Sequence, residues 1–187
     1  MDRREALKSV AFLIGSAISA TTMGVLFESF TLPDNEKNKV SFSGSDEDIL
    51  AEFADIIIPT TASSPGAKAA GLGPFIPMMI RDCYPENMQE IFATGLKAMQ
   101  DKCVKDFNKD FLNMSVAERQ KLMSNLRDEA IATNKEPSFF LIARDLTLLG
   151  YYSSEIGCTQ AREYLPVPGR YDGSAEYKPG QKAWATN

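Results

Sequence analysis

Apolar residues recur every three to four positions between residues 46 and 155, and this spacing restricts the fold more than any other feature. A helix with about 3.6 residues per turn collects such side chains on one face, whereas a half-buried strand alternates apolar and polar residues. No window of the chain has that alternation. The sequence therefore predicts an all-α protein, with a compact helical bundle over residues 46–155.

Prolines and polar caps divide this bundle into helices. Ser45 and Asp48 have the spacing of a variant capping box, which predicts the start of the first helix. Pro59 ends that helix, because proline lacks the backbone donor that a helix interior needs. Residues 60–73 are rich in small side chains and glycine, and predict a loop. The apolar face of the first helix carries Ile49, Leu50, Phe53, Ile56 and Ile57.

Three segments in the middle of the chain also have helical periodicity. The run between Pro74 and Pro85 predicts a short helix, and residues 86–107 predict a long amphipathic one. Ser115 and Glu118 have the spacing of a second capping box, which predicts another helix start. The apolar face of the helix that follows carries Leu122, Leu126 and Ile131.

The last predicted helix is the most apolar. Pro137 suits its first turn, and the sequence SFFLIARDLTLLGYY that follows is apolar around most of the helix. Such a helix is expected at the centre of the bundle. Arg144 and Asp145 interrupt its apolar surface. Because a buried unpaired charge is strongly destabilising, we expect these two residues to be paired or to reach the surface.

Composition excludes several classes of chemistry. The 187 residues include no histidine, the usual general base near neutral pH and the commonest metal ligand. The net charge is −5 and no run of lysine or arginine offers a basic face, so no nucleic-acid partner is expected. Cys83, Cys103 and Cys158 form no C-x-x-C pair, and we expect no metal site. The cysteines are either buried and inert or engaged in a disulfide within the chain or with another chain.

The first thirty residues have the layout of an export signal. Arg3, Arg4, Leu7 and Lys8 occupy the places of a bacterial twin-arginine signal, and nineteen uncharged residues follow Lys8. We therefore expect a signal over residues 1–30, a linker over 31–45, recognition by the twin-arginine translocase and a periplasmic location. The sequence leaves open whether the signal is cleaved or stays as a membrane tether.

The end of the chain cannot continue as a regular helix. Prolines and glycines recur from Pro166 to Gly180, which predicts an extended arm over residues 156–187. The arm carries aromatic rings that it cannot bury against itself, so they pack either on the bundle or on another chain. These rings belong to Tyr164, Tyr171, Tyr177 and Trp184.

Four stretches of sequence carry a resemblance to one family: FADIIIPTTASSPGAKAAGLGPFI, RDCYP, GYYSSEIGCTQ and YLPVPGRYDG. Together they make the chain similar to the gluconate 2-dehydrogenase subunit 3 family, the small subunits of bacterial flavin-dependent sugar dehydrogenases. The resemblance implies a non-catalytic subunit that holds no cofactor of its own. Its partner would be a larger dehydrogenase of the glucose–methanol–choline type that binds FAD, and electrons would then pass to a cytochrome c subunit.

The resemblance also implies a role in export and maturation, because the small subunit would supply the signal for a partner that folds around FAD before transport. Within this interpretation, the arm is expected to make the main contact with the catalytic subunit. The predicted contact residues are Tyr164, Pro166, Pro168, Arg170, Tyr171 and Asp172. Arg170 is the expected polar anchor, since a guanidinium binds a carboxylate through two hydrogen bonds. The loop over residues 60–73 is a second candidate.

Two other functions remain open from the residues alone. Asp55 with Asp82 or Glu155 could form a carboxylate pair of the kind that hydrolyses glycosides, which would make the chain a small enzyme. Solvated charges on helix faces are the simpler interpretation of these three residues. A ligand-binding bundle with a closed apolar pocket is the other alternative.

Overall fold

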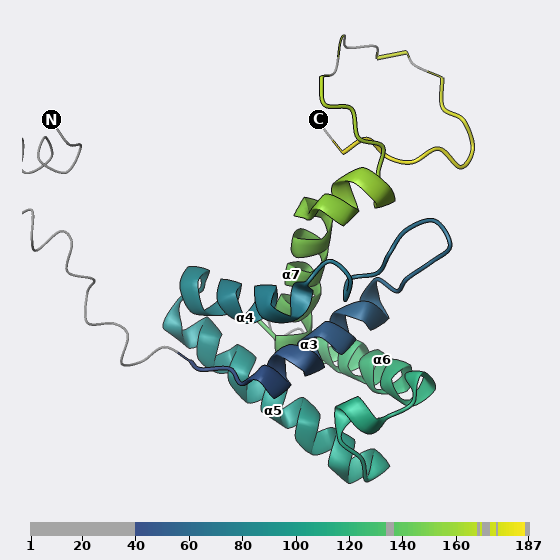
Figure 1. The fold of residues 1–187 in the computed structure, drawn as a ribbon. Helices are drawn as coiled ribbons and strands as arrows, with labels where there is room; N and C mark the ends of the chain where they lie inside the picture. The colour runs from purple at the N-terminus through teal and green to yellow at the C-terminus, as the bar shows by residue number, and fades with distance from the viewer. Residues whose placement is uncertain (1–39, 134–136, 168, 170–172, 175, 186–187) are drawn as a thin grey trace, which may run out of the picture. The chain divides into compact units, whose positions relative to one another are not determined.

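The computed structural model describes residues 40–133, 137–167, 169, 173–174 and 176–185. This part of the chain forms five α-helices and two short helical turns, η2 (Phe111–Asn113) and η3 (Gly157–Ala161). Figure 1 shows how the helices are arranged. The five helices are α3 (Gly44–Ile57), α4 (Leu72–Cys83), α5 (Glu86–Phe107), α6 (Val116–Thr133) and α7 (Phe139–Ser153). The described residues contain no strand, only an isolated bridge between Glu163 and Trp184. The predicted all-α class is confirmed.

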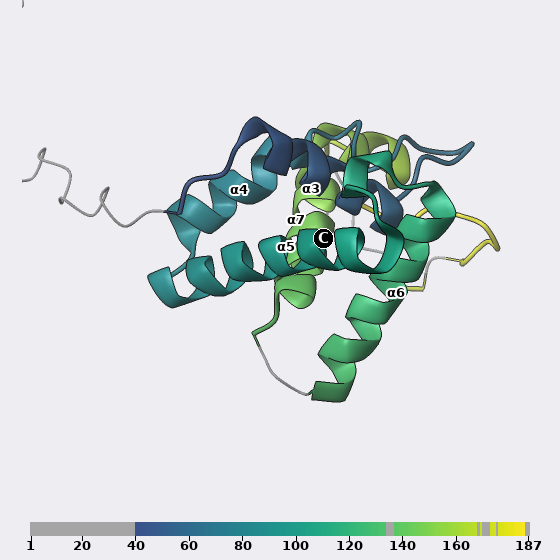
Figure 2. The same cartoon turned by 90° about the horizontal axis from the view of Figure 1, so that it is seen from below.

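Helix α7 lies at the centre of the bundle, as its apolar sequence predicted. It packs against α3, α4, α5 and α6, and in Figure 2 it passes behind α5. Its buried side chains lie on about one half of the helix, and Leu148 and Leu149 on the other half are exposed. The buried residues are Phe139, Phe140, Ile142, Ala143, Leu146, Thr147 and Tyr151. Because these side chains meet four different helices, α7 organises the whole core.

Aromatic rings fill the junction of α3, α5 and α7. The ring centroid of Phe53 lies 5.7 Å from that of Phe139 and 6.1 Å from that of Phe140. Phe92 on α5 completes the cluster, with its centroid 5.0 Å from that of Phe139. Edge-to-face contacts of this kind add to the stabilisation that apolar burial provides.

A glycine allows α4 and α7 to approach closely. A Cβ atom on Gly150 would lie 2.5 Å from the ring of Phe75 and 2.7 Å from the side chain of Leu72. Any larger residue at this position would push the two helices apart or displace those side chains.

The helix starts differ from the sequence predictions in three places. Helix α4 begins at Leu72, inside the predicted loop, because proline is tolerated in a first turn and Pro74 lies there. Ser43, not Ser45, caps α3, and its partner is Asp46 rather than Asp48; the Asp46 carboxylate accepts from the Ser43 amide at 2.9 Å. Both pairs have the same spacing, so the sequence pattern alone did not separate them. Pro137 lies before α7 rather than in its first turn, and Ser138 is the cap.

Helix α6 begins as predicted but its last turn is less buried than predicted. The second capping box is confirmed, since the Ser115 amide and hydroxyl both donate to the Glu118 carboxylate. Leu122 is buried, whereas Ile131, which was expected on the apolar face, has 66% of its surface exposed. The reason is helix geometry: Ile131 follows Leu122 by nine residues, which at 3.6 residues per turn places it on the opposite side of α6, whereas Ala130 packs against the core.

The two charges of α7 reach the surface and pair with each other. The Arg144 guanidinium donates to one Asp145 carboxylate oxygen at 2.9 and 2.7 Å, and both side chains are exposed. Among the described residues, none of the helices combines the length and the apolar character needed to cross a bilayer.

Candidate functional site

The candidate site is built on the carboxyl-terminal end of α7, whose last backbone carbonyls need donors from outside the helix. The Ser154 hydroxyl donates to the Tyr151 carbonyl at 2.7 Å. The Tyr152 carbonyl accepts from the Cys158 thiol at 3.2 Å and from the Arg162 guanidinium. Side chains that follow α7 in the sequence therefore donate hydrogen bonds to its last backbone carbonyls.

Gly157 makes this return of the chain possible. It begins the π-helical turn η3, and a Cβ atom at this position would lie 1.9 Å from the Tyr151 carbonyl oxygen. No other residue fits at that distance without moving the backbone. The glycine in the sequence EIGCTQ therefore has a steric role, which the sequence analysis did not assign.

Arg162 fixes the direction in which the chain leaves the bundle. Its guanidinium carbon lies 5.1 Å from the centroid of the Tyr152 ring, in addition to the hydrogen bond to the Tyr152 carbonyl. A positive charge is favourable here, because the carboxyl end of a helix carries partial negative charge and an aromatic face attracts cations. Sequence analysis missed this residue.

Two short stretches of backbone then hold the ends of the C-terminal segment together. The Glu163 amide donates to the Ala183 carbonyl, and the Ala185 amide donates to the Glu163 carbonyl, each at 2.8 Å. The Lys182 ammonium adds a hydrogen bond to the Gln160 carbonyl. We call residues 162–163 and 183–185 the C-terminal clasp, because their backbone hydrogen bonds join two stretches of chain that lie about twenty residues apart in the sequence.

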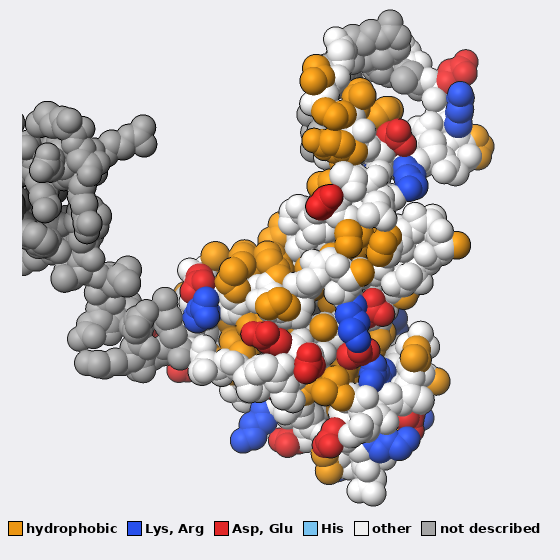
Figure 3. Space-filling model, in the orientation of Figure 1, with side chains coloured by type: hydrophobic (Ala, Val, Ile, Leu, Met, Phe, Trp, Pro, Cys, Tyr) orange, Lys and Arg blue, Asp and Glu red, His pale blue; other side chains and the backbone are white. Residues whose placement is uncertain are grey.

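The C-terminal segment exposes large apolar side chains close to this clasp. Figure 3 shows hydrophobic side chains gathered on it, and a second group over α4. The exposed fractions are 49% for Tyr164, 41% for Leu165 and 77% for Val167. Apolar groups that gather on a surface in this way mark interaction sites.

Only some of the predicted contact residues fall in the described part of the chain. Tyr164 and Pro166 are exposed beside the clasp. Pro168, Arg170, Tyr171 and Asp172 lie outside the described residues, as do the signal residues Arg3, Arg4, Leu7 and Lys8. The extended arm over residues 156–187 stays a prediction, while its first residues, up to Ala161, are helical.

One family model matches this chain over residues 45–169, from the first turn of α3 to the C-terminal segment. Its description is Gluconate 2-dehydrogenase subunit 3. The chain belongs to the gluconate 2-dehydrogenase subunit 3 family. A comparison with curated proteins and one with solved structures gave no match.

The loop after α3 is held to the bundle in this family member. The buried Tyr151 hydroxyl donates to the Pro65 carbonyl at 2.7 Å, and the Ala67 amide donates to the Ile58 carbonyl at 2.8 Å. The Asp55 carboxylate accepts from the Lys68 amide at 3.3 Å. These contacts give the loop a structural role in joining α3 to α4.

The Glu52 carboxylate on α3 joins the loop after α3 to α6. It forms ion pairs with Lys68 and Arg119, and hydrogen bonding from Lys68 lowers the pKa of its carboxyl group. Arg119 also donates to the backbone carbonyls of Phe111 at 2.9 Å and Leu112 at 2.7 Å. This network ties α3, the loop after it, η2 and α6 together, so its charges serve the fold.

The carboxylates proposed for an enzyme have separate surroundings. Asp82 is exposed and pairs with its neighbour Arg81 at 2.9 and 3.0 Å, while Glu155 is exposed after the end of α7. Asp55 is engaged with the loop backbone, as described above. Within the described residues, no cluster of three or more His, Cys, Asp or Glu side chains could hold a metal ion.

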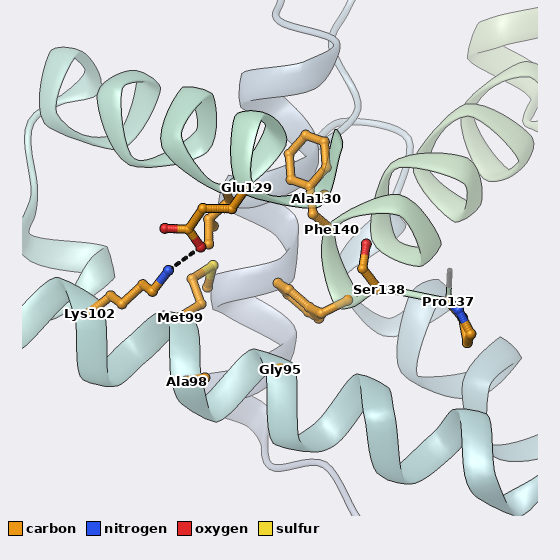
Figure 4. Close-up of a pocket in the computed structure, with 11 residues that line it drawn as sticks. Gly95, Ala98, Met99, Lys102, Glu129, Ala130, Pro137, Ser138 and Phe140 are labelled. Carbon is orange, nitrogen blue, oxygen red and sulfur yellow. Dashed lines mark hydrogen bonds and ion pairs between the residues drawn. The ribbon is translucent and has the colours of Figure 1, made fainter. Parts of the chain in front are cut away.

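A cavity of about 320 Å³ lies between α5, α6 and the first turn of α7 (Figure 4). Met99, Leu126 and Phe140 give it an apolar lining, and the ion pair between Lys102 and Glu129 crosses one side. The cavity is open to solvent, unlike the closed apolar pocket expected of a ligand-binding bundle.

The three cysteines are free thiols in different environments. Cys103 is buried, and burial raises the pKa of its thiol to about 11, so it stays protonated and unreactive near neutral pH. Cys83 is exposed and Cys158 is half-buried beside the Tyr152 carbonyl. Inert burial, one of the two expectations from the sequence, therefore describes Cys103.

Proposed function

We propose that this chain is the non-catalytic small subunit of a periplasmic FAD-dependent sugar or sugar-acid dehydrogenase of the glucose–methanol–choline type. It stabilises the catalytic subunit, assists its maturation and supplies the twin-arginine signal that exports both chains. The chain itself holds no cofactor. The catalytic subunit binds FAD, and a cytochrome c subunit accepts the electrons.

The observation that carries this proposal is the family match, because it covers the bundle and the start of the C-terminal segment. The family is that of a third subunit of a dehydrogenase complex, so an accessory role in such a complex follows from membership. The exposed Tyr164, Leu165 and Val167 support a partner contact, since apolar surface gains stability when another protein covers it. The arginine pair at positions 3 and 4 supports export of a folded complex.

Co-expression with the FAD-dependent catalytic subunit of the source organism tests the proposal. A tagged wild-type chain is expected to co-purify from the periplasm with a flavin-loaded partner, and the isolated chain is expected to show no flavin absorbance and no sugar oxidation. The double variant Arg3→Lys, Arg4→Lys should leave both chains in the cytoplasm. Export of the catalytic subunit in that variant would refute the export role.

Single variants locate the contact. Tyr164→Ala, Arg170→Ala and Tyr171→Ala should each weaken co-purification while the helical circular dichroism stays unchanged. Val116→Ala is the matched control, because Val116 is 65% exposed at the start of α6. Equal loss of binding in the control would mean that the contact is not on the C-terminal segment. Sugar oxidation by the isolated chain would instead favour the carboxylate enzyme.

A further inference from the structure

The geometry of the clasp leads to an inference about how the partner is recognised. We infer that the C-terminal segment binds the catalytic subunit as a loop already closed by the C-terminal clasp, and that this closure, rather than contact by the Trp184 ring, is what binding requires. The inference rests on the proposed function and adds to it a positioning role for Arg162, Glu163 and Ala185.

Both ends of the loop are fixed in the unbound chain. The two backbone hydrogen bonds of Glu163, each 2.8 Å long, join it to Ala183 and Ala185. Lys182 and Gln160 are joined on the same side of the segment. The unbound chain has therefore already lost the conformational entropy that closing the loop requires.

The base of the C-terminal segment is attached to α7, the helix that packs against the other four. Arg162 stacks on Tyr152 and donates to its carbonyl, and Tyr152 belongs to α7, the central helix. Gly157 brings the chain back against the end of the same helix. Tyr164, Leu165 and Val167 follow immediately after this base, so the clasp sets where these exposed side chains begin.

Preorganisation of this kind changes affinity without adding a contact. A free arm must order its backbone and its side chains when it binds, and that loss of entropy reduces the affinity. A loop closed in advance loses less. Opening the clasp should therefore weaken binding even though every apolar side chain of the segment is still present.

A proline at position 185 tests closure with little other change. Ala185→Pro removes the amide that donates to the Glu163 carbonyl, and proline favours an extended residue before it, which suits Trp184 in the bridge. Ala185→Val keeps the amide and is the matched control. Trp184→Ala removes the ring but keeps both backbone hydrogen bonds.

The first measurement uses the unbound full chain. Hydrogen exchange should show protected amides at Glu163 and Ala185 in the wild type, and Glu163 should lose protection in Ala185→Pro but not in Ala185→Val. Trp184 is the only tryptophan of the chain, so acrylamide quenching of its fluorescence reports on the same place. Unprotected amides in the wild type would overturn the inference, because the loop would then be open before binding.

The second measurement is the affinity for the purified catalytic subunit. Ala185→Pro, and a chain that ends at Lys182, should bind at least about tenfold more weakly than the wild type, while Ala185→Val and Trp184→Ala should stay within about twofold. Wild-type affinity in Ala185→Pro with a proven open clasp would overturn the inference and leave the proposed function intact. A loss in Trp184→Ala equal to that of the truncated chain would also overturn it, because the ring would then be the contact. Absence of binding by the wild type would refute the proposed function itself.

Discussion

The helical bundle buries its large apolar side chains, whereas the C-terminal segment exposes them. In the bundle, Phe53 and Phe92 are completely buried and pack ring against ring with Phe139. In the segment, Val167 and Tyr177 have 77% and 73% of their surface exposed. The clasp lies between the two regions and is made mostly of backbone hydrogen bonds rather than of apolar packing.

This difference separates residues that stabilise the chain from residues that contact a partner under the proposed function. Burial of apolar area stabilises the folded state, and exposed side chains contribute almost nothing to it. The bundle is therefore expected to fold without the segment's side chains, whereas the segment gains its stabilisation only in a complex. Three of the four predictions below compare a variant in or next to the bundle with a control variant in the C-terminal segment.

The largest effect is expected in the aromatic cluster. Phe53→Ala should lower the free energy of unfolding by about 3–5 kcal/mol, because it removes a buried ring and leaves a cavity between α3 and α7. Val167→Ala should change it by less than about 0.5 kcal/mol. Urea unfolding followed by circular dichroism measures both. A comparable loss in the two variants would mean that the segment is packed on the bundle.

A smaller effect is expected at the turn that joins the two regions. Gly157→Ala should destabilise the protein by about 1–3 kcal/mol, because the new Cβ atom would lie 1.9 Å from the Tyr151 carbonyl oxygen. Gly169→Ala is the control within the segment, since a Cβ atom there has nothing within 4 Å. Thermal unfolding of the two variants makes the comparison, and a neutral Gly157→Ala would show that the end of α7 can shift freely.

The sequence alone predicted the helices of the bundle, because the spacing of apolar residues indicates both where a helix forms and which of its faces is buried. The central position of α7 followed from its apolar circumference, and the capping box at Ser115 followed from the spacing to Glu118. The pattern failed where two solutions had equal spacing, at Ser43 and Ser45, and at Ile131, whose spacing of nine residues from Leu122 places it on the opposite side of α6.

The candidate site was predicted in part, for a related reason. Tyr164 and Pro166 lie in a proline-rich stretch that cannot form a helix, so the sequence predicted their exposed, non-helical position, while their contact with a partner stays a prediction. Arg162, by contrast, acts on the ring and carbonyl of Tyr152, and Glu163 binds backbone some twenty residues later. Contacts between two irregular segments leave no periodic pattern in the sequence, so only the structure revealed the clasp.

A modest effect is expected where the loop after α3 meets the central helix. Tyr151→Phe removes the hydroxyl that donates to the Pro65 carbonyl at 2.7 Å, and should cost about 1 kcal/mol of stability. Tyr177→Phe, in the exposed segment, should cost nothing measurable. The two variants differ from the wild type by one oxygen atom each, so chemical denaturation compares burial directly. A neutral Tyr151→Phe would mean that water replaces the hydroxyl and that the loop is not held by it.

The smallest effect concerns the exposed cap of α6. A hydrogen bond from Lys109, together with those from the amide and hydroxyl of Ser115, lowers the pKa of Glu118 from its usual 4.5 to about 2. Because the folded state holds this proton less readily than the unfolded chain, the stabilisation is complete above pH 4.5 and is lost as the pH falls toward 2.

Solvent screens this exposed group, so the gain in stability should be small even though the titration shifts clearly. An NMR titration of the Glu118 carboxyl carbon should give a midpoint well below 4.5, and Lys109→Ala should raise it. Glu118→Gln should remove this part of the pH dependence of unfolding. A titration midpoint near pH 4.5 in the wild type would show that the hydrogen bonds of the cap are open in solution. The stable contacts of the chain would then be confined to its buried core.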